Sequence, residues 1–291
     1  MNLPAVIRGT ATAALLVACS MGARAAEAPV GIVENPCPPA LVPPAALAEQ
    51  IRKLLLEPHV VTPAELKTFQ DDAQLKAYNE ATFAQARSDW ANLCRYREDN
   101  ARVRASGVAP RAVFMGDSIT EFWSAADPAF FGEKVINRGI SGQTTPQMLV
   151  RFQADVIALR PQVVHILAGT NDVAGNTGPT SPADFKNNVK AMVEMAKANQ
   201  IAVILGSIPP TAAFNWRPQI KPVPIIQALN AWLREYAAQQ GIGFVDYYSA
   251  LAGSSGELKS DLANEGVHPN LNGYRVMRRL VDQALEKKRA E

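Results

Sequence analysis

Short apolar runs alternate with longer amphipathic stretches from Arg111 onward, and this alternation most constrains the fold. The runs have the length of buried strands and lie at Ala112–Met115, Lys134–Ile136, Val163–Ala168, Ala202–Ile208 and Gly243–Val245. The stretches have helical spacing and lie near Thr145–Leu159, Ala183–Asn199, Pro224–Gln239 and Leu271–Glu286. Strands separated by helices form a parallel sheet that is covered on both faces. We therefore expect a three-layer α/β/α sandwich with a five-stranded parallel sheet, which binds ligands at the carboxyl ends of its strands.

The N-terminal segment predicts export from a bacterial cytoplasm. Arg8 and the free amine give it a positive start, and the apolar run Ala11–Ala18 is too short to span a bilayer. The Ala23-Arg24-Ala25 site that follows predicts a signal peptide over residues 1–25 and a periplasmic or secreted protein. The alternative is a lipobox ending at Cys19, which would make the protein an outer-membrane lipoprotein. No other stretch is long and apolar enough to predict a transmembrane segment.

Residues 26–105 predict a helical extension, and residues 106–291 predict the α/β domain. Thr62 and Glu65 flank Pro63 with the spacing of a helix N-cap and its capping box. Apolar side chains recur at helical steps at Leu47, Ile51, Leu54 and Leu55, and again at Trp90, Leu93 and Tyr96. The extension has no catalytic motif, and it either clamps the main domain or shapes the mouth of its site.

Charge and cysteine content narrow the possible partners and the compartment. The formal net charge is +2 and the charged residues are dispersed, so nothing favours a nucleic-acid or membrane-surface partner. Once Cys19 is removed or lipidated, Cys37 and Cys94 remain as an even pair in an oxidising compartment. A disulfide between them would stabilise the fold by about 2–4 kcal/mol. The alternative is two buried thiols.

The sequence Gly116-Asp117-Ser118 directly follows the first predicted strand. A serine at a strand-to-helix turn exposes its hydroxyl, and the N-terminus of the next helix directs N–H groups toward negative charge. This arrangement suits a nucleophile in acyl transfer, although Asp117 or Ser118 serving only as a helix cap is the alternative. Thr120 stands where the G-x-S-x-G elbow of the α/β-hydrolases needs glycine, so that motif is absent.

The three histidines are the candidates for a general base. His165 lies inside a predicted buried strand, and His59 lies in the extension, far in sequence from any strand end. His268 lies in a loop just before the last predicted helix, where Gly266 gives the backbone freedom. Imidazole titrates near neutral pH, so His268 is the candidate base.

Two further loops follow strands and carry candidate hydrogen-bond donors. In Gly169–Asp172, the side chain of Asn171 can donate to an oxyanion. In Asn137–Gly142, Gly139 allows a backbone N–H to approach a substrate closely. A plain turn is the alternative for each loop.

The chain order of these four segments resembles the SGNH hydrolase superfamily, also called GDSL esterases and lipases. The resemblance covers residues 111 to about 286 and implies the flavodoxin-like fold of that superfamily, with no cofactor. It implies that Ser118 attacks an ester carbonyl and that His268 takes the serine proton. The implied oxyanion hole consists of the backbone N–H groups of Ser118 and Gly139 and the side chain of Asn171, with Asp117 and Asp172 in supporting positions.

The resemblance departs from the family at the acidic residue. The family usually has Asp three residues before the histidine, and this position is Glu265. A glutamate can also orient an imidazole, but its side chain is one methylene longer. The alternatives are that a backbone carbonyl orients the ring or that Asp261 replaces the acid.

The expected substrate is a small-molecule or carbohydrate ester with a short acyl group, such as an O-acetyl group. Trp123, Phe214 and Trp216 either flank this substrate or pack in the core. A lipase or lysophospholipase and a non-catalytic envelope binding module are the other hypotheses. The histidines and cysteines lack the spacing of a metal site, and no P-loop or G-x-G-x-x-G motif predicts a nucleotide cofactor.

Overall fold

The structure, a computed structural model, describes residues 31–290. The chain divides into two units after Cys37, and every element below belongs to the second unit, which starts at Pro38. The predicted signal peptide, its cleavage after Ala25 and the alternative lipid site at Cys19 lie outside the described residues. Within residues 31–290, the helices are all too short or too polar to cross a membrane.

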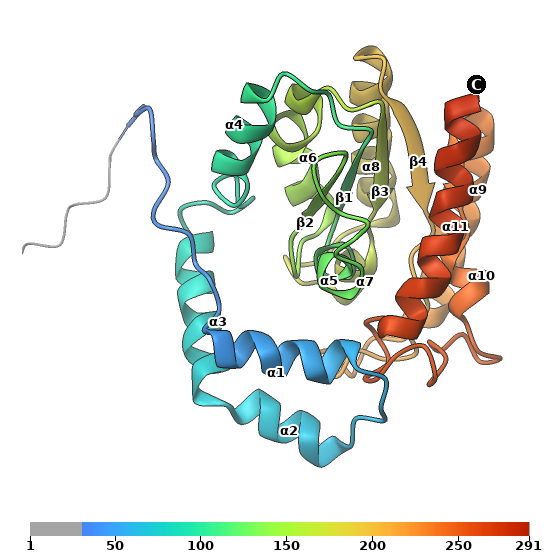
Figure 1. The fold of residues 1–291 in the computed structure, drawn as a ribbon. Coiled ribbons are helices and arrows are strands. Elements are labelled where there is room, and N and C mark those ends of the chain that lie inside the picture. The colour runs from blue at the N-terminus through green and yellow to red at the C-terminus, as the bar shows by residue number, and fades with distance from the viewer. Residues whose placement is uncertain (1–30, 291) are drawn as a thin grey trace, which may run out of the picture. The chain divides into compact units, whose positions relative to one another are not determined.

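A five-stranded parallel sheet forms the centre of the second unit, as the sequence predicts (Figure 1). The strand order is β2-β1-β3-β4-β5, and every neighbouring pair is parallel. The bounds of the strands are β1 Ala112–Gly116, β2 Val135–Gly139, β3 Val163–Leu167, β4 Ala202–Gly206 and β5 Gly243–Val245. The chain leaves β1 toward one side to form β2 and returns past β1 to form β3, so the order reverses beside β1.

Alternate residues of each strand point to opposite faces, and each face is covered by helices. Val113 and Met115 pack into one apolar cluster, whereas Ala112 and Phe114 pack into the other. The first cluster lies under α6 (Thr145–Asp155), α8 (Pro182–Ala198) and α9 (Pro222–Gln240). The second lies under α5 (Ser118–Ala126), α10 (Tyr247–Leu251) and α11 (Leu271–Ala290). The expected three-layer α/β/α sandwich is confirmed.

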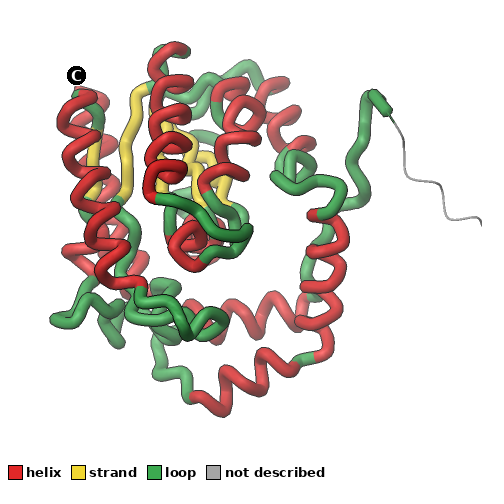
Figure 2. Tube along the Cα trace, turned by 180° about the vertical axis from the view of Figure 1, so that it is seen from behind, coloured by secondary structure: helices red, strands yellow, loops and turns green. Residues whose placement is uncertain are grey.

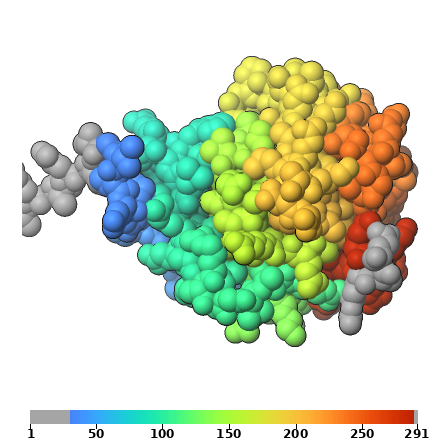
Figure 3. Space-filling model, turned by 90° about the horizontal axis from the view of Figure 1, so that it is seen from above, coloured from blue at the N-terminus to red at the C-terminus, as the bar shows by residue number. Residues whose placement is uncertain are grey.

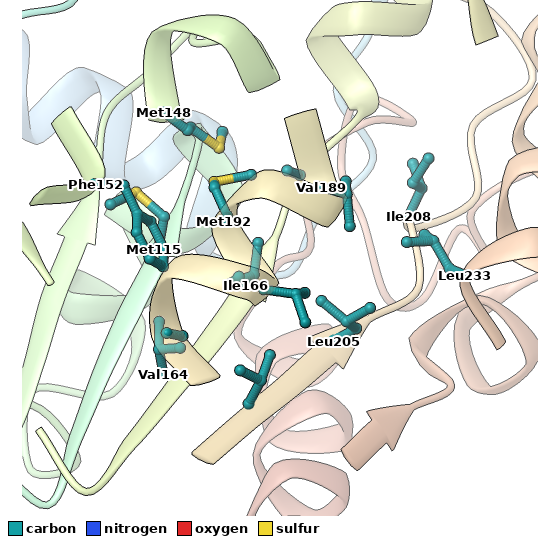
Figure 4. Packing of buried hydrophobic residues seen from close by; sticks show 14 of the residues in the cluster. Met115, Met148, Phe152, Val164, Ile166, Val189, Met192, Leu205, Ile208 and Leu233 are labelled. Carbon is teal, nitrogen blue, oxygen red and sulfur yellow. The ribbon is translucent and has the colours of Figure 1, made fainter. Parts of the chain in front are cut away.

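Figure 4 shows the first cluster at the level of side chains. Met115 and Ile166 project from β1 and β3 toward Met148 of α6 and Met192 of α8, and all four side chains are buried. Unbranched methionines fill the irregular space between sheet and helices. This packing fixes the strands whose carboxyl ends carry the site. Two short helices complete the sandwich, the 3-10 helix η1 (Ile157–Leu159) and α7 (Thr170–Ala174).

The predicted extension contains four helices within the same compact unit. Their bounds are α1 Ala45–Leu56, α2 Pro63–Asp71, α3 Ala73–Ala86 and α4 Arg97–Ala105. The capping box at α2 is present, because Glu65 N–H donates to Thr62 Oγ1 and Thr62 N–H donates to the Glu65 carboxylate. Leu55 and Leu56 of α1 join the second apolar cluster.

The expected helical spacing around Trp90–Tyr96 is wrong. Residues 87–96 form turns, and Asn92 has a positive φ of 54°. The side chain of Asp89 accepts hydrogen bonds from the N–H groups of Leu93 and Cys94, which replaces the pairing that a helix would need. Cys37 and Cys94 are each disulfide-bonded.

Helices α1 and α2 of the extension lie at one end of the sandwich, whereas α4 packs beside α6 and η1 (Figure 1). The views from the front and from behind agree that α1 runs beneath the end where α5 and the loop before α11 lie (Figures 1 and 2). The opposite end, seen in Figure 3, shows α4 in teal on one side and α11 in red on the other. The extension therefore contacts the end at which the strands finish.

Candidate active site

The predicted site residues meet at the carboxyl ends of β1, β2 and β3. Ser118 follows β1, Gly139 ends β2, and Asn171 lies in α7 just after β3. β2 lies on one side of β1 and β3 on the other. The carboxyl end of β1 is therefore the topological switch point, where α/β sheets bind their ligands. The fold thus brings together Ser118 and Asn171, which are more than 50 positions apart in the sequence.

Ser118 is the first residue of α5, and Asp117 is its N-cap. Asp117 Oδ1 accepts a hydrogen bond of 3.0 Å from the Ile119 N–H. The residue that caps the helix is therefore Asp117 and not Ser118. At the first helical position, the Ser118 N–H has no acceptor within its helix. Its hydroxyl is therefore presented beside an unpaired donor at the positive end of a helix.

Ser118, His268 and Glu265 form a continuous chain of hydrogen bonds. Ser118 Oγ lies 2.8 Å from His268 Nε2, and His268 Nδ1 lies 2.8 Å from Glu265 Oε1. The same Glu265 oxygen accepts the backbone N–H groups of Val267 and His268, which closes the loop around the carboxylate. A carboxylate only accepts, so Nδ1 carries the proton and Nε2 is free to accept the serine proton.

The longer side chain of Glu265 is accommodated by this loop, in which Gly266 has a positive φ of 87°. The alternative acid, Asp261, is exposed, and its backbone carbonyl rather than its carboxylate contacts Asn270. Asn270 also accepts from the N–H groups of Asn272 and Gly273 and caps α11, so the helix begins at Leu271 directly after the His268 loop.

Burial and charge shift the titration of this group in opposite directions. Burial lowers the pKa of His268, but the charge and hydrogen bond of Glu265 outweigh burial, and the net pKa is raised. Burial raises the pKa of Glu265, whereas the charge of His268 and its hydrogen bonds lower it, and the net pKa is lowered. The pair therefore favours an imidazolium beside a carboxylate, the state that a general base reaches after it takes a proton.

Asn171 is the centre of a second network beside Ser118. Its Nδ2 donates to Asp117 Oδ2 at 3.2 Å and to the Gln143 carbonyl at 3.1 Å, and its Oδ1 accepts from Asn176 Nδ2. Burial raises the pKa of Asp117 to about 7. Asp172 points instead to α6, where its carboxylate accepts from Thr145. Asp117 thus orients Asn171, and Asp172 holds the loop between β2 and α6.

Gly139 does not fit the predicted place in an oxyanion hole. It is the last residue of β2, and its N–H already donates to Asn137 Oδ1 at 2.8 Å. A Cβ at Gly139 would lie 2.2 Å from the Glu121 nitrogen, so the glycine is needed for close packing of β2 against α5. Because this N–H is already bonded to Asn137, Gly139 does not offer it to an oxyanion.

Gly142 is a candidate hydrogen-bond donor that was not predicted from the sequence. It has a φ of 78°, is exposed, and has open space around the position of a Cβ. Within residues 31–290, no acceptor is found for its N–H. The signal was present in the sequence as a second glycine in Gly139-Ile140-Ser141-Gly142, three residues beyond the end of the strand.

The three aromatic candidates differ in exposure. Trp123 and Phe214 are fully buried and belong to the core, whereas the side chain of Trp216 is 41% exposed. Trp216 Nε1 donates to Asn176 Oδ1 at 3.0 Å, and Asn176 in turn contacts Asn171. Trp216 is therefore the aromatic residue of the three that is linked to the site.

The remaining histidines are not part of this arrangement. His165 is fully buried in β3, where it stacks on Phe114 and contacts the Tyr247 hydroxyl, as expected for a core histidine. His59 lies near Asn264 in the loop that precedes Glu265. Within the part of the chain that the structure describes, no three His, Cys, Asp or Glu side chains are grouped to hold a metal ion.

Comparisons with known proteins agree with this geometry. Residues 114–276 match the model of the GDSL-like Lipase/Acylhydrolase family. A GDSL-like lipase from Bacteroides thetaiotaomicron is 46% identical, with a TM-score of 0.64 over 68% of this chain and 98% of that chain. Esterase TesA from Pseudomonas aeruginosa is 30% identical over 47% of this chain and 62% of its own length.

A shorter match involves an acetylxylan esterase from Geobacillus stearothermophilus. It is 48% identical over 42 residues, which are 14% of this chain and 19% of that protein. The chain thus spans less than two thirds of the length of the curated relatives it matches.

Proposed function

Because the chain belongs to the GDSL-like lipase/acylhydrolase family, we propose that it is a serine esterase that hydrolyses carboxylic esters. The observation that carries this proposal is the chain from Ser118 Oγ to His268 Nε2 and on to Glu265, with 2.8 Å at each step. Nucleophile, base and orienting acid are thereby within hydrogen-bonding reach of one another. Esterase TesA, whose name states the same activity, gives further support.

In the proposed reaction, Ser118 Oγ attacks the ester carbonyl while His268 Nε2 takes the serine proton. The negative charge that develops on the carbonyl oxygen is stabilised by the N–H groups of Ser118 and Gly142. The Asn171 amide joins them when one of its two N–H groups, which donate to Asp117 and to the Gln143 carbonyl, turns to the substrate. The imidazolium then gives its proton to the departing alcohol and leaves an acyl group on Ser118. A water molecule deprotonated by His268 releases the acid and restores the serine.

We propose that the preferred substrates are short acyl esters on a carbohydrate. The support is Trp216, whose exposed indole is held by Asn176 next to Asn171. A fixed, amphipathic ring is suited to contact one face of a sugar while its N–H remains hydrogen-bonded. The local match to an acetylxylan esterase agrees with this substrate class.

The substrate proposal is tested with three kinds of ester. We expect turnover of p-nitrophenyl esters to fall as the acyl chain grows from two to about eight carbons, and acetylated xylan to release acetate. In Trp216→Ala, KM should rise for acetylated xylan and remain near wild type for p-nitrophenyl acetate. Faster hydrolysis of a lysophospholipid than of acetylated xylan would refute the carbohydrate proposal and favour a lipase.

We also propose that the protein acts outside the cytoplasm, either free or attached through Cys19. The Ala23-Arg24-Ala25 site and the disulfide-bonded state of Cys37 and Cys94 support this location. N-terminal sequencing of the mature protein tests it, because cleavage after Ala25 gives a chain that starts at Ala26. A mature chain that retains residues 1–25 would contradict export by cleavage, and a lipid-modified Cys19 would identify a lipoprotein.

A further inference from the structure

The extension makes hydrogen bonds with the two loops that carry the proposed catalytic groups. The solved lipase from Bacteroides thetaiotaomicron matches 68% of this chain while covering 98% of its own, so about a third of this chain lies outside the match. The extension from Pro38 onward belongs to the same compact unit as the site. Figures 1 and 2 both place α1 beside the loops before α11.

The first contact is made by Asn264, which directly precedes Glu265. Asn264 Nδ2 donates to the carbonyl oxygens of Leu54 and Glu57, at 2.9 and 2.6 Å. These carbonyls belong to the C-terminal end of α1, where backbone acceptors lack partners within the helix. The side chain of Asn264 therefore caps α1 and joins it to the loop that carries the acid and the base.

The chain after α1 binds Asn264 from its other side. The N–H of His59 donates to Asn264 Oδ1 at 3.3 Å, and the N–H of Val61 donates to the Asn264 carbonyl at 3.4 Å. Asn264 Oδ1 also accepts from Asn270, the cap of α11, at 3.0 Å. Asn264 is only 8% exposed. Its hydrogen bonds join the chain around α1 to both ends of the loop that carries His268.

The second contact is made by the turns at Trp90–Tyr96. The Ala91 carbonyl accepts from Gln143 Nε2 at 2.9 Å, and the Tyr96 hydroxyl donates to the Gly139 carbonyl. Gln143 directly follows Gly142, and its own carbonyl accepts from Asn171. The loop that presents the proposed oxyanion donors is therefore held by the extension as well.

From these contacts we infer that residues 54–61 and 90–96, here called the clamp, position the two loops of the active site. The inference rests on the proposed function. Asn264 and Tyr96 are positioning residues in it: they touch no substrate and act through Glu265–His268 and through the loop at Gly142. The clamp restrains both loops by hydrogen bonds that are part-buried or buried, and so keeps Nε2 and the N–H donors aligned with Ser118.

The test compares Asn264→Ala with Asp72→Ala in the full-length protein. Asp72 caps α3 in the extension and lies outside both contacts, so Asp72→Ala is the matched control. For Asn264→Ala we expect kcat for p-nitrophenyl acetate to fall about 10- to 100-fold, because small misplacements of catalytic groups have effects of this size. KM should stay within about twofold, because the groups that contact the substrate remain. Asp72→Ala should keep wild-type kcat.

A second variant and a second measurement cover the case in which Asn264→Ala fails to fold. Tyr96→Phe removes only the hydroxyl that contacts Gly139, and we expect it to lower kcat about 3- to 10-fold, a smaller effect than losing the Asn264 contacts. Amide hydrogen exchange should become faster at residues 262–270 in Asn264→Ala and at residues 139–143 in Tyr96→Phe, and unchanged there in Asp72→Ala.

These results separate the clamp from the proposed function. Full turnover in Ser118→Ala would defeat the proposed function. If Ser118→Ala is inactive, wild-type kcat and wild-type exchange in both Asn264→Ala and Tyr96→Phe would overturn the clamp. An equal loss of kcat in Asp72→Ala would also overturn it, because the effect would then reflect the stability of the extension alone.

Discussion

Arg151 donates a hydrogen bond of 3.0 Å to the carbonyl oxygen of Gly116, the residue at the end of β1. The same guanidinium donates to Gln143 Oε1 at 2.6 Å and to Asp155 at 2.9 Å, and its side chain is fully buried. One planar group thus joins the turn that carries Ser118 to the loop that carries Gly142. This three-way contact uses the fixed donor geometry that distinguishes arginine from lysine.

We therefore predict that Arg151→Lys lowers both stability and kcat. Lysine keeps the charge opposite Asp155 but cannot replace all three contacts. Gln143 Oε1 then loses its buried donor, which costs about 1–3 kcal/mol, whereas the Gly116 carbonyl keeps the Ile140 N–H. Urea unfolding measures this loss, and exposed Arg102→Lys is the matched control. A free energy of unfolding for Arg151→Lys within about 0.5 kcal/mol of the control, the usual spread for surface substitutions, would contradict the bracing role.

The pH dependence of kcat/KM reports the pairing of His268 with Glu265. The base must be neutral, and its raised pKa places the acidic limb of the profile above about pH 6.5, the ordinary value for imidazole. Glu265→Gln removes the charge that raises this pKa while burial still lowers it, so the limb should move to lower pH. The plateau should fall, but by less than in His268→Ala. Equal losses of kcat in the two variants would show that the carboxylate is indispensable.

His165 makes the stability of the fold depend on pH. Burial lowers its pKa to about 3, so between pH 6.5 and 3 the unfolded chain binds a proton that the native chain does not. Stability linked to His165 is therefore lost as the pH falls through this window. We predict that the free energy of unfolding of wild type falls relative to that of His165→Gln by up to about 1.4 kcal/mol per pH unit. Parallel urea-unfolding results for the two proteins at pH 6 and pH 4 would refute this assignment.

The two disulfide-bonded cysteines lead to a prediction about their pairing. We expect Cys37 and Cys94 to be bonded to each other, so that Cys37→Ser, Cys94→Ser and the double variant all lose about the same stability, 2–4 kcal/mol. Non-reducing peptide mapping by mass spectrometry identifies the pair directly. Recovery of either cysteine in a different linkage would rule out this pairing.

Most of the fold was predictable because the signals for its strands are local. The runs at Ala112–Met115 and Val163–Ala168 differ from β1 and β3 by a single residue, since buried parallel strands are continuous apolar segments. The prediction of a helix at residues 87–96 was wrong because it relied on apolar spacing alone. The Asp89 side chain accepts hydrogen bonds from backbone N–H groups there and stabilises turns instead.

The site was predictable only where its residues follow strands. Ser118 and Asn171 are placed by β1 and β3, whereas the choice between Gly139 and Gly142 depends on which N–H is already bonded. The contacts of Asn264 with Leu54 and Glu57 join residues more than 200 positions apart, and no pattern in the sequence predicts such a pair. His59 shows the same limit, because a residue remote in sequence lies beside the loop of the proposed base.

The most direct test of the account is the reactivity of Ser118. A fluorophosphonate should modify the wild-type protein at one site, Ser118, as located by peptide mass spectrometry, and abolish hydrolysis of p-nitrophenyl acetate. Ser118→Ala should be unmodified, keep the circular dichroism of wild type and lose about 10⁴-fold or more in kcat. A folded Ser118→Ala protein that retains turnover within about tenfold of wild type would contradict the account, because loss of a nucleophile lowers kcat by several orders of magnitude.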